Sequence, residues 1–409
     1  MEFKIVVDNI RKYEKDTFLF LAGQAISLFG SGLVQYAIMW HITLETKSGL
    51  MMTIFIICGF LPTFFLSPFA GVWADRYNRK MIIIIADAFI AITTLILAIL
   101  FMSGYDDLWL LFLMSALRAF GTGIHSPAIG AILPQIVPEE KLTRINSINS
   151  SIQSVVFIVA PMVSAGIMNK IPLGRIFIID VVTAAIAIFI LVFLLEVPPH
   201  PKAMERNTSS YLSDFKEGIQ YICNHGYVKM FFLFCIIFFF LISPLAFLTP
   251  LQTTRSYGDD VWRLSALEVA FSGGMIFGGA FMAYWGGFKN KMHTMALSIV
   301  VTGLATIGLG FRPQFWIYLA LMAALGITMP MFNTPSTVLL QKKVDQDYLG
   351  RVFGVLSMIH SSTMPLGMLL FGPLADIIKI EFILIGTGIL MFSMTFFLLS
   401  SKVMLQAGE

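Results

Sequence analysis

Twelve segments of the sequence are long and apolar enough to cross a lipid bilayer as helices, and this feature limits the possible folds more than any other. A spanning helix needs roughly 20 mainly apolar residues. A membrane β-barrel would instead show alternating segments of about ten residues. The chain is therefore predicted to be an all-α polytopic membrane protein. The predicted spans cover residues 17–44, 51–74, 81–104, 108–134, 145–169, 175–196, 229–253, 264–286, 292–311, 315–340, 351–378 and 381–400.

The composition agrees with lipid as the solvent of most of the chain. Hydrophobic residues make up 57% of the 409 residues, and charged residues make up 12%, about half of their usual share in a soluble domain. The three cysteines, Cys58, Cys223 and Cys235, are scattered and support neither a disulfide framework nor a metal site. The glycine-rich stretch 273–279 lies inside an apolar segment and there is no Walker-type loop, so we expect no enzymatic ATP hydrolysis.

Lys and Arg residues concentrate in the segments that would share one side of the membrane with the N-terminus. The positive-inside rule assigns such segments to the cytoplasm. The charged N-terminal stretch lacks the pattern of a removable signal peptide. We therefore expect a multi-pass protein with both termini in the cytoplasm.

A polar stretch after the sixth span divides the chain into two halves. We predict an N-terminal six-helix bundle at 1–196, a cytoplasmic linker at 197–228 with a short surface helix at 212–221, and a C-terminal six-helix bundle at 229–409. Duplicated, pseudo-symmetric halves are the usual build of secondary transporters. Three short motifs recur in the two halves at nearly the same interval: Val137-Leu142-Arg144 with Val344-Leu349-Arg351, His125-Pro127 with Asn333-Pro335, and Trp73-Asn78-Arg79 with Trp285-Asn290-Lys291.

The turn between the second and third predicted spans carries a dense charge pattern. The sequence from Gly71 to Lys80 is G-V-W-A-D-R-Y-N-R-K, so one acid and three bases fall within six residues. An acid can cap a helix end, and bases can reach carboxylates or the carbonyls at a helix C-terminus. Contacts that exist in only one conformation would let this turn bias a two-state equilibrium. The alternative is that the bases simply follow the positive-inside rule.

These features together resemble the major facilitator superfamily over nearly the whole chain. Within it, the turn DRYNRK, the following Asp87, and the motif 117–123 (L-R-x-x-G-T-G) are similar to the twelve-helix drug:proton antiporters of the macrolide-efflux type. The resemblance implies a gating role for the charged turn, in which Asn78 stands where the family usually has Gly. Because Asn tolerates left-handed backbone, we expect it to preserve the turn. The residues to which the gating role is assigned are Gly71, Asp75, Arg76, Arg79 and Lys80.

Charged residues inside the predicted spans are candidates for proton coupling, because each needs a partner or a wet cavity within the bilayer. Asp87 and Arg118 lie at similar predicted depths, so we expect an ion pair between them, which is either a protonation switch or a static salt bridge. Asp180 and Glu268 lie nearer the outer face, where simple hydration is the alternative, and His360 is a further candidate. The first span contains no acid, although some drug antiporters place theirs there.

Polar side chains form stripes on several spans and are candidates for lining a substrate cavity. Gln24, Ser31 and Gln35 share one face of the first span at helical spacing. The alternative is that such stripes hold helices together. The other cavity candidates are Thr122, His125, Asn146, Gln153 and Ser357.

The resemblance implies a proton-coupled exporter of amphipathic drugs such as macrolides, working by alternating access in a bacterial cytoplasmic membrane. Its partners would be the bilayer, protons and a small amphipathic substrate, without nucleic acid, metal or cofactor, and we expect a monomer driven by the proton motive force. Two alternatives remain open at this point. One is a siderophore or lysolipid carrier of the same superfamily, and the other is a non-transporting membrane sensor with this fold.

Overall fold

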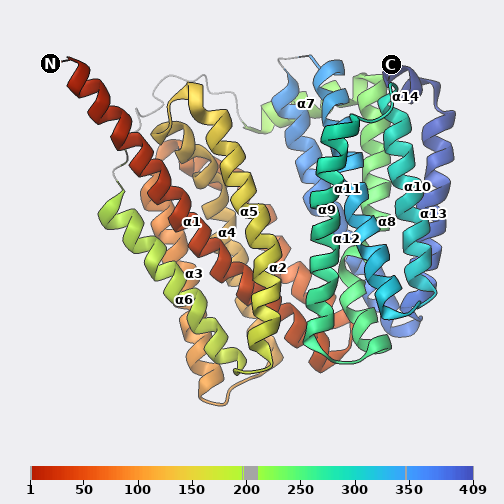
Figure 1. The fold of residues 1–409 in the computed structure, drawn as a ribbon, viewed down its shortest axis with the longest axis horizontal. Helices are drawn as coiled ribbons and strands as arrows, with labels where there is room; N and C mark the ends of the chain where they lie inside the picture. The colour runs from red at the N-terminus through yellow and green to blue at the C-terminus, as the bar shows by residue number, and fades with distance from the viewer. Residues whose placement is uncertain (1, 196, 198–210, 346–347, 409) are drawn as a thin grey trace. The chain divides into compact units, whose positions relative to one another are not determined.

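The computed structural model describes residues 2–195, 197, 211–345 and 348–408, and the elements assigned within these ranges are all helices. Twelve of them are long and apolar enough to cross a membrane, which confirms the predicted number of spans (Figure 1). The spanning helices are α1 (Glu2–Thr46), α2 (Gly49–Arg76), α3 (Arg79–Met102), α4 (Leu108–Ile136), α5 (Glu139–Met168), α6 (Leu173–Phe189) with the π-helical turn η1 (Ile190–Leu194), α8 (Gly226–Tyr257), α9 (Val261–Trp285), α10 (Lys291–Gly310), α11 (Phe315–Lys343), α12 (Leu349–Ile377) and α13 (Ile380–Ser400).

Corresponding asparagines begin one helix in each half of the chain. The Asn78 side chain accepts a hydrogen bond from the Met81 backbone N–H at 3.3 Å, at the start of α3. The Asn290 side chain accepts one from the Met292 N–H at 2.9 Å, at the start of α10. Asparagine is a preferred residue at this N-cap position, because its side chain satisfies a backbone donor that has no partner within the helix. The aligned motifs of the two halves therefore share a structural role.

The chain forms two compact units. Unit 1 comprises Met1–Ile42 and Ile54–Arg206, and unit 2 comprises Thr43–Thr53 and Asn207–Glu409. Residues 43–53, which we call the hairpin tip, join α1 to α2 but belong to unit 2. Helices α1 and α2 therefore each run from one unit into the other.

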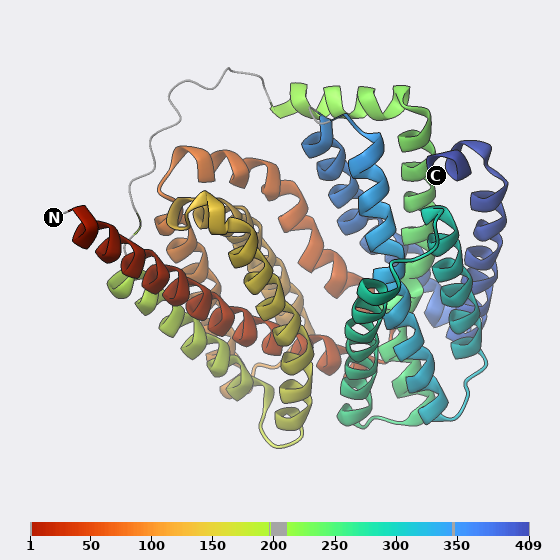
Figure 2. The ribbon, with the colours of Figure 1, turned by 45° about the horizontal axis from the view of Figure 1, so that its top comes forward.

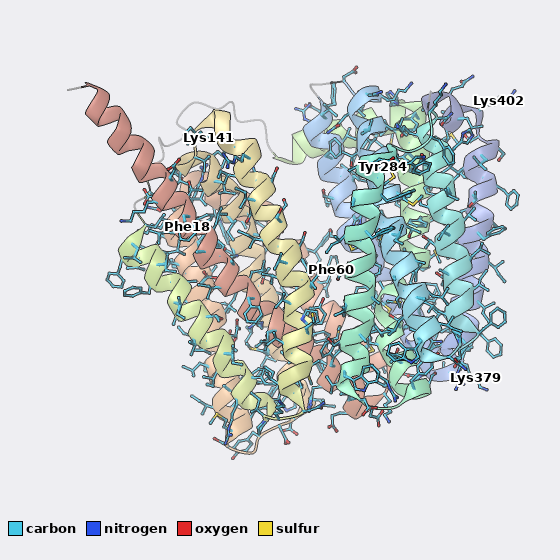
Figure 3. The ribbon with its side chains drawn as sticks, in the orientation of Figure 1. Phe18, Phe60, Lys141, Tyr284, Lys379 and Lys402 are labelled. Atoms are coloured by element: carbon cyan, nitrogen blue, oxygen red, sulfur yellow. The ribbon has the colours of Figure 1, made fainter. Side chains whose placement is uncertain are left out.

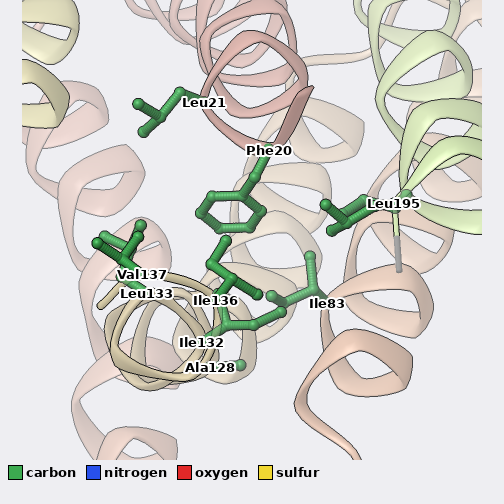
Figure 4. Packing of buried hydrophobic residues seen from close by; sticks show 10 residues of the cluster. Phe20, Leu21, Ile83, Ala128, Ile132, Leu133, Ile136, Val137 and Leu195 are labelled. Atoms are coloured by element: carbon green, nitrogen blue, oxygen red, sulfur yellow. The ribbon is translucent and has the colours of Figure 1, made fainter. Parts of the chain in front are cut away.

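In unit 1, α3 packs between α4 and α6. One end of this unit is closed by a buried apolar cluster from α1, α3, α4 and the segment that follows α6. Figure 4 shows the Phe20 ring pointing toward Ile136, with Ile83 and Leu195 beside it. The cluster fixes the start of α3 against the ends of α4 and η1.

In unit 2, α8 packs against α12 and α13, α9 packs against α11, and α10 packs against α11 and α13. Lys379 and Lys402 mark opposite ends of α13, whereas Tyr284 is an exposed aromatic residue on α9 (Figure 3). A short helix at the C-terminus, α14 (Lys402–Ala407), contacts α8 and α13.

The linker contains helix α7 (Tyr211–Asn224), which confirms the short helix predicted at 212–221. It runs across the ends of neighbouring helices rather than alongside them (Figure 2). Arg351 pairs with Glu217 at 3.0 Å. The ring of Tyr221 stacks on Tyr348 with 4.4 Å between centroids. These contacts tie α7 to the beginning of α12.

Candidate functional site

Unit 1 contains two adjoining cavities of about 350 and 320 Å³, which share Leu28, Ser31 and Thr122 as wall residues. We call the two together the polar cavity. Its first part reaches Gln35 and Arg118. Its second part is lined, among others, by Gln24, Asp87, His125 and Gln153.

The predicted polar stripe on the first span therefore does face a cavity. Gln24, Ser31 and Gln35 all line it, and so do Thr122, His125 and Gln153. Asn146 and Ser357 are exposed and are not among its lining residues.

Arg118 forms a buried ion pair with Asp180 on α6, and the predicted pairing of Arg118 with Asp87 was wrong. The Arg118 guanidinium also donates to the Thr94 hydroxyl at 2.8 Å, and the Ser31 hydroxyl donates to the Asp180 carboxylate at 3.1 Å. Asp180 is 1% exposed, so hydration does not explain this acid. A buried pair of this kind is stable only because further hydrogen bonds satisfy both charges.

Depth along the helices explains this choice of partner. The depth of each residue can be measured along its helix from the turns 103–107 and 169–172, at 1.5 Å per residue. The depths of Arg118 and Asp180 then differ by about 4–5 Å, whereas the depths of Arg118 and Asp87 differ by about 7–8 Å. Close approach of α1 and α6 brings Ser31 into the same cluster. At Gly30, a Cβ atom would lie 3.2 Å from the Asp180 Cα atom and closer still to the Thr183 side chain. Glycine at this position permits the contact.

Asp87 lies instead at the depth of His125. The His125 Nε2 atom is 3.1 Å from the Asp87 Oδ1 atom, close enough for an ion pair but outside the direction of a well-formed hydrogen bond. Asp87 is 3% exposed, and its Oδ2 atom is buried without a hydrogen-bond partner among the residues described. An acid and an imidazole thus meet at the wall of the polar cavity.

The charged turn is shorter than predicted. Helix α2 continues to Arg76 and α3 begins at Arg79, which leaves only Tyr77 and Asn78 between them. Asn78 has a φ of −65°. Asn78 therefore does not use the left-handed backbone that it tolerates, and it serves as a helix cap in this turn instead.

Two bases of the turn contact helix carbonyls, as the sequence analysis predicted. Arg79 donates to the Ala131 carbonyl of α4 at 2.8 Å, and Lys80 donates to the Leu195 carbonyl at 2.8 Å. Cations stabilise the C-terminal ends of helices in this way. Of the other predicted gating residues, Gly71, Asp75 and Arg76 fall in the last turns of α2, where the side chains lie outside the described part of the structure.

The remaining proton-coupling candidates, Glu268 and His360, belong to unit 2. Glu268 lines a separate cavity of that unit. His360 lies against the ring of Phe239, with 4.3 Å between the ring centroids.

Sequence reasoning missed Asp376, the most heavily hydrogen-bonded acid of unit 2 among the contacts described. Its carboxylate accepts from the backbone N–H groups of Gly49 at 2.7 Å and Leu50 at 2.9 Å, and from the Ser48 hydroxyl at 2.7 Å. Arg255 pairs with it at 2.8 Å. We call these five residues the tip clasp, because they hold the hairpin tip against α12.

A sequence signal for the clasp existed. Gly372 and Asp376 end α12 with the same G-x-x-x-D spacing that Gly71 and Asp75 have at the end of α2. Gly372 lies against the hairpin tip, since a Cβ atom there would come within 2.7 Å of the Gly49 carbonyl oxygen. At the end of α12 the glycine of this spacing allows close approach and the acid accepts hydrogen bonds.

Within the described ranges, no group of three or more His, Cys, Asp or Glu side chains is placed to hold a metal ion. Residues 20–368 match the family described as Major Facilitator Superfamily. The chain belongs to the major facilitator superfamily. Membership and the twelve spanning helices together make it a multi-pass membrane protein of a transporter family.

Relatives within the superfamily include efflux proteins. Macrolide efflux protein A of Streptococcus pyogenes is 31% identical over 373 residues, covering 90% of this chain and 92% of the relative. Macrolide efflux protein A of Enterococcus faecalis is 30% identical over 314 residues, covering 76% and 97%. Among solved structures, the nucleoside transporter NupG superposes with a TM-score of 0.69 at 17% identity, covering 95% of this chain and 99% of NupG. That likeness concerns the fold alone.

Proposed function

We propose that the protein is a proton-coupled exporter of amphipathic, largely apolar compounds such as macrolides, acting by alternating access. The observation that carries the proposal is the polar cavity of unit 1, whose wall holds Asp87 and His125 side by side. The similarity to macrolide efflux proteins supports the substrate class. We further propose that the protein resides in a bacterial cytoplasmic membrane with both termini inside, and that it works as a monomer without a cofactor.

In this mechanism Asp87 carries the transported proton. A proton on its Oδ2 atom, which has no hydrogen-bond partner among the described residues, removes the negative charge that this wall offers to a ligand. Loss of the proton restores that charge. Proton binding and ligand binding would therefore compete for the same wall of the cavity, which is what exchange of one for the other requires.

The Arg118–Asp180 pair has a different task in this proposal. Both charges are buried and bonded to hydroxyl groups, so the pair holds α1, α3, α4 and α6 together at the other part of the cavity. Arg118 still lines the cavity, and Asp180 neutralises its charge there. Bound ligand would thus contact a fixed ion pair at one part and the acid and imidazole of Asp87 and His125 at the other.

The driving force is adequate for export. Moving one proton through about 100 mV releases about 2.3 kcal/mol, which supports a concentration ratio of roughly fifty. The same force would power any other amphipathic substrate, so it does not select among compounds.

The test is uptake of radiolabelled erythromycin into inside-out membrane vesicles that contain the protein and are energised by respiration. We expect accumulation that a protonophore abolishes, and we expect Asp87→Asn to reduce it to the protonophore level. Asp106→Asn is the matched control, because Asp106 is exposed and lies in the turn between α3 and α4. Accumulation that resists the protonophore, or an Asp87→Asn protein that exports normally, would contradict the proposed coupling.

A further inference from the structure

The two parts of the polar cavity differ in how the protein uses their polar side chains. Around the first part, the Thr63 hydroxyl donates to the Ala119 carbonyl at 2.8 Å, and the Ser31 hydroxyl donates to the Asp180 carboxylate at 3.1 Å. Arg118 pairs with the same carboxylate. These groups serve contacts between helices, so their hydrogen bonds are made within the protein.

The second part contains buried polar atoms that the protein does not bond. Gln24 is 8% exposed, Asp87 is 3% exposed, and both line this part of the cavity. The Gln24 Nε2 atom and the Asp87 Oδ2 atom have no hydrogen-bond partner among the described residues. Such buried atoms are rare in folded proteins. Because both side chains face a cavity, they indicate a hydrogen-bonding partner from outside the chain.

The rest of the second part continues this chemistry. Thr122 and Ser126 lie one turn apart on α4, Asn149 and Gln153 lie one turn apart on α5, and Ser27 belongs to α1. Hydroxyl and amide groups can each both donate and accept hydrogen bonds. The matching ligand group must therefore donate and accept at several points, as the hydroxyls of a sugar do. Aliphatic side chains complete the wall and suit the C–H faces of a sugar ring.

We propose that the second part of the polar cavity is a subsite for a sugar group of the ligand, with Gln24 and Asp87 as its specificity-determining residues. Sugar hydroxyls would donate to the Asp87 Oδ2 atom and accept from the Gln24 Nε2 atom. The volume of about 320 Å³ is near the lower limit for sites of drug-sized ligands, so the subsite would hold one part of a larger compound. This inference rests on the proposed export function and names the ligand group that the cavity selects.

The first part of the cavity accounts for the remainder of such a ligand. Leu28, Val156 and Phe157 contribute apolar side chains to its wall. The two parts share wall residues, so one ligand can extend from the first part into the second. A free sugar would leave the apolar wall uncovered. The cavity therefore favours a sugar that is attached to an apolar body.

The charge of Asp87 connects the subsite with the proposed proton exchange. An ionised carboxylate accepts stronger hydrogen bonds than a neutral acid does. The sugar group would therefore bind better when Asp87 carries no proton. This is the competition between ligand and proton that the proposed exchange requires.

The test is binding of three probes to the purified protein. They are erythromycin, its N-desmethyl-N-acetyl derivative, which is neutral but keeps both sugars, and its sugar-free macrolactone. We expect the wild-type protein to bind the neutral derivative about tenfold more tightly than the macrolactone. Gln24→Leu should weaken binding of the neutral derivative about threefold to tenfold, because one hydrogen bond is lost, and should leave binding of the macrolactone unchanged.

The matched control is Thr63→Val in the first part of the cavity. It should leave the ratio of the two affinities unchanged, because the Thr63 hydroxyl bonds a helix carbonyl. The thermal unfolding midpoint separates ligand binding from a structural role. Gln24→Leu should leave the midpoint unchanged or raise it, because the amide that it removes is buried without a partner. If Gln24→Leu does not fold, Gln153→Leu decides, because this exposed residue of the same wall should also be needed for the sugar preference.

Four results would overturn the inference. They are equal binding of the neutral derivative and the macrolactone by the wild-type protein, an unchanged sugar preference in Gln24→Leu or in the Gln153→Leu substitute, binding of erythromycin that is lost in the neutral derivative, and equally strong competition by methyl β-glucoside. The third result would show that the amine is bound instead, and the fourth would identify a free sugar as the ligand. The proposed export fails separately: sugar-dependent binding through Gln24 without proton-driven uptake in vesicles would refute the exporter and leave this subsite standing.

Discussion

The tip clasp gives the sharpest test of the structure. We predict that Asp376→Ala loosens the hairpin tip much more than Asp376→Asn does. Alanine removes every acceptor for Ser48, Gly49 and Leu50, together with the partner of Arg255. Asparagine keeps one acceptor oxygen for the start of α2, but it loses the charge and replaces the other acceptor oxygen by an NH2 group.

The magnitude follows from these contacts. Loss of a helix N-cap costs about 0.5–2 kcal/mol. The pair between Arg255 and Asp376 is about a third exposed on both sides, so solvent screening reduces its worth to about 0.2–1 kcal/mol. Asp376→Ala should therefore raise the population of the opened tip by roughly 3–150-fold, whereas Asp376→Asn, which keeps one of the two acceptor oxygens, should raise it by a smaller factor.

Thiol labelling measures that opening. Met52 lies in the hairpin tip and is 1% exposed, so Met52→Cys should react with N-ethylmaleimide only when the tip opens. The background needs alanine in place of the three free cysteines, Cys58, Cys223 and Cys235. The labelling rate of purified protein then reports the opened fraction.

The control is Asp107→Ala, because Asp107 occupies the N-cap position of α4 but makes no side-chain cap bond there. It should leave the labelling rate unchanged. A rate for Asp376→Ala within twofold of the parent protein would refute the reasoning, and so would equal acceleration by Asp376→Asn and Asp376→Ala.

Three further predictions concern stability, measured as the thermal unfolding midpoint in detergent. Gly274→Ala should lower the free energy of unfolding by about 1–3 kcal/mol, because the added methyl group overlaps the α11 backbone. Gly279→Ala should be neutral or stabilising, because its methyl group meets open space. Equal unfolding midpoints for the two variants would contradict this prediction. Asp180→Asn should lower the free energy of unfolding by about 3–5 kcal/mol, because it leaves a buried guanidinium unpaired. The double replacement of Arg118 by Met and Asp180 by Leu should lower it less, because no buried charge is left unpaired. A larger loss of stability in the double variant would count against this explanation. Asn290→Ala should lower the free energy of unfolding by about 1 kcal/mol, because it removes the N-cap hydrogen bond of α10. An unchanged unfolding midpoint would show that this cap is dispensable.

The sequence was sufficient to predict the spans and the repeat, because both depend on patterns along the chain. Long apolar runs predict spanning helices wherever they occur. The aligned Asn78 and Asn290 even share a cap role, since the local residues of a helix start determine its capping. Helical periodicity placed Gln24, Ser31 and Gln35 on one face of the first span, and all three line the polar cavity of unit 1.

The choice of partners between helices was not predictable from these patterns. Arg118 had two acids within plausible reach, and the difference in depth that favours Asp180 over Asp87 depends on where each helix ends. Asp376 was overlooked because its partners Gly49 and Leu50 offer backbone N–H groups, which carry no side-chain signal. Long-range pairing of this kind is determined by the packing of the helices.

The buried pair of Arg118 and Asp180 also constrains how the protein is made. The two residues are 62 positions apart, so at roughly 5–20 residues per second the arginine is synthesised about 3–12 s before its partner. During that interval α4 carries a charge that costs about 2.5–3.5 kcal/mol at the centre of a bilayer. Membrane insertion of α4 should therefore be delayed, or remain reversible, until α6 arrives. The four helices that meet at this pair would then integrate as a group rather than one at a time.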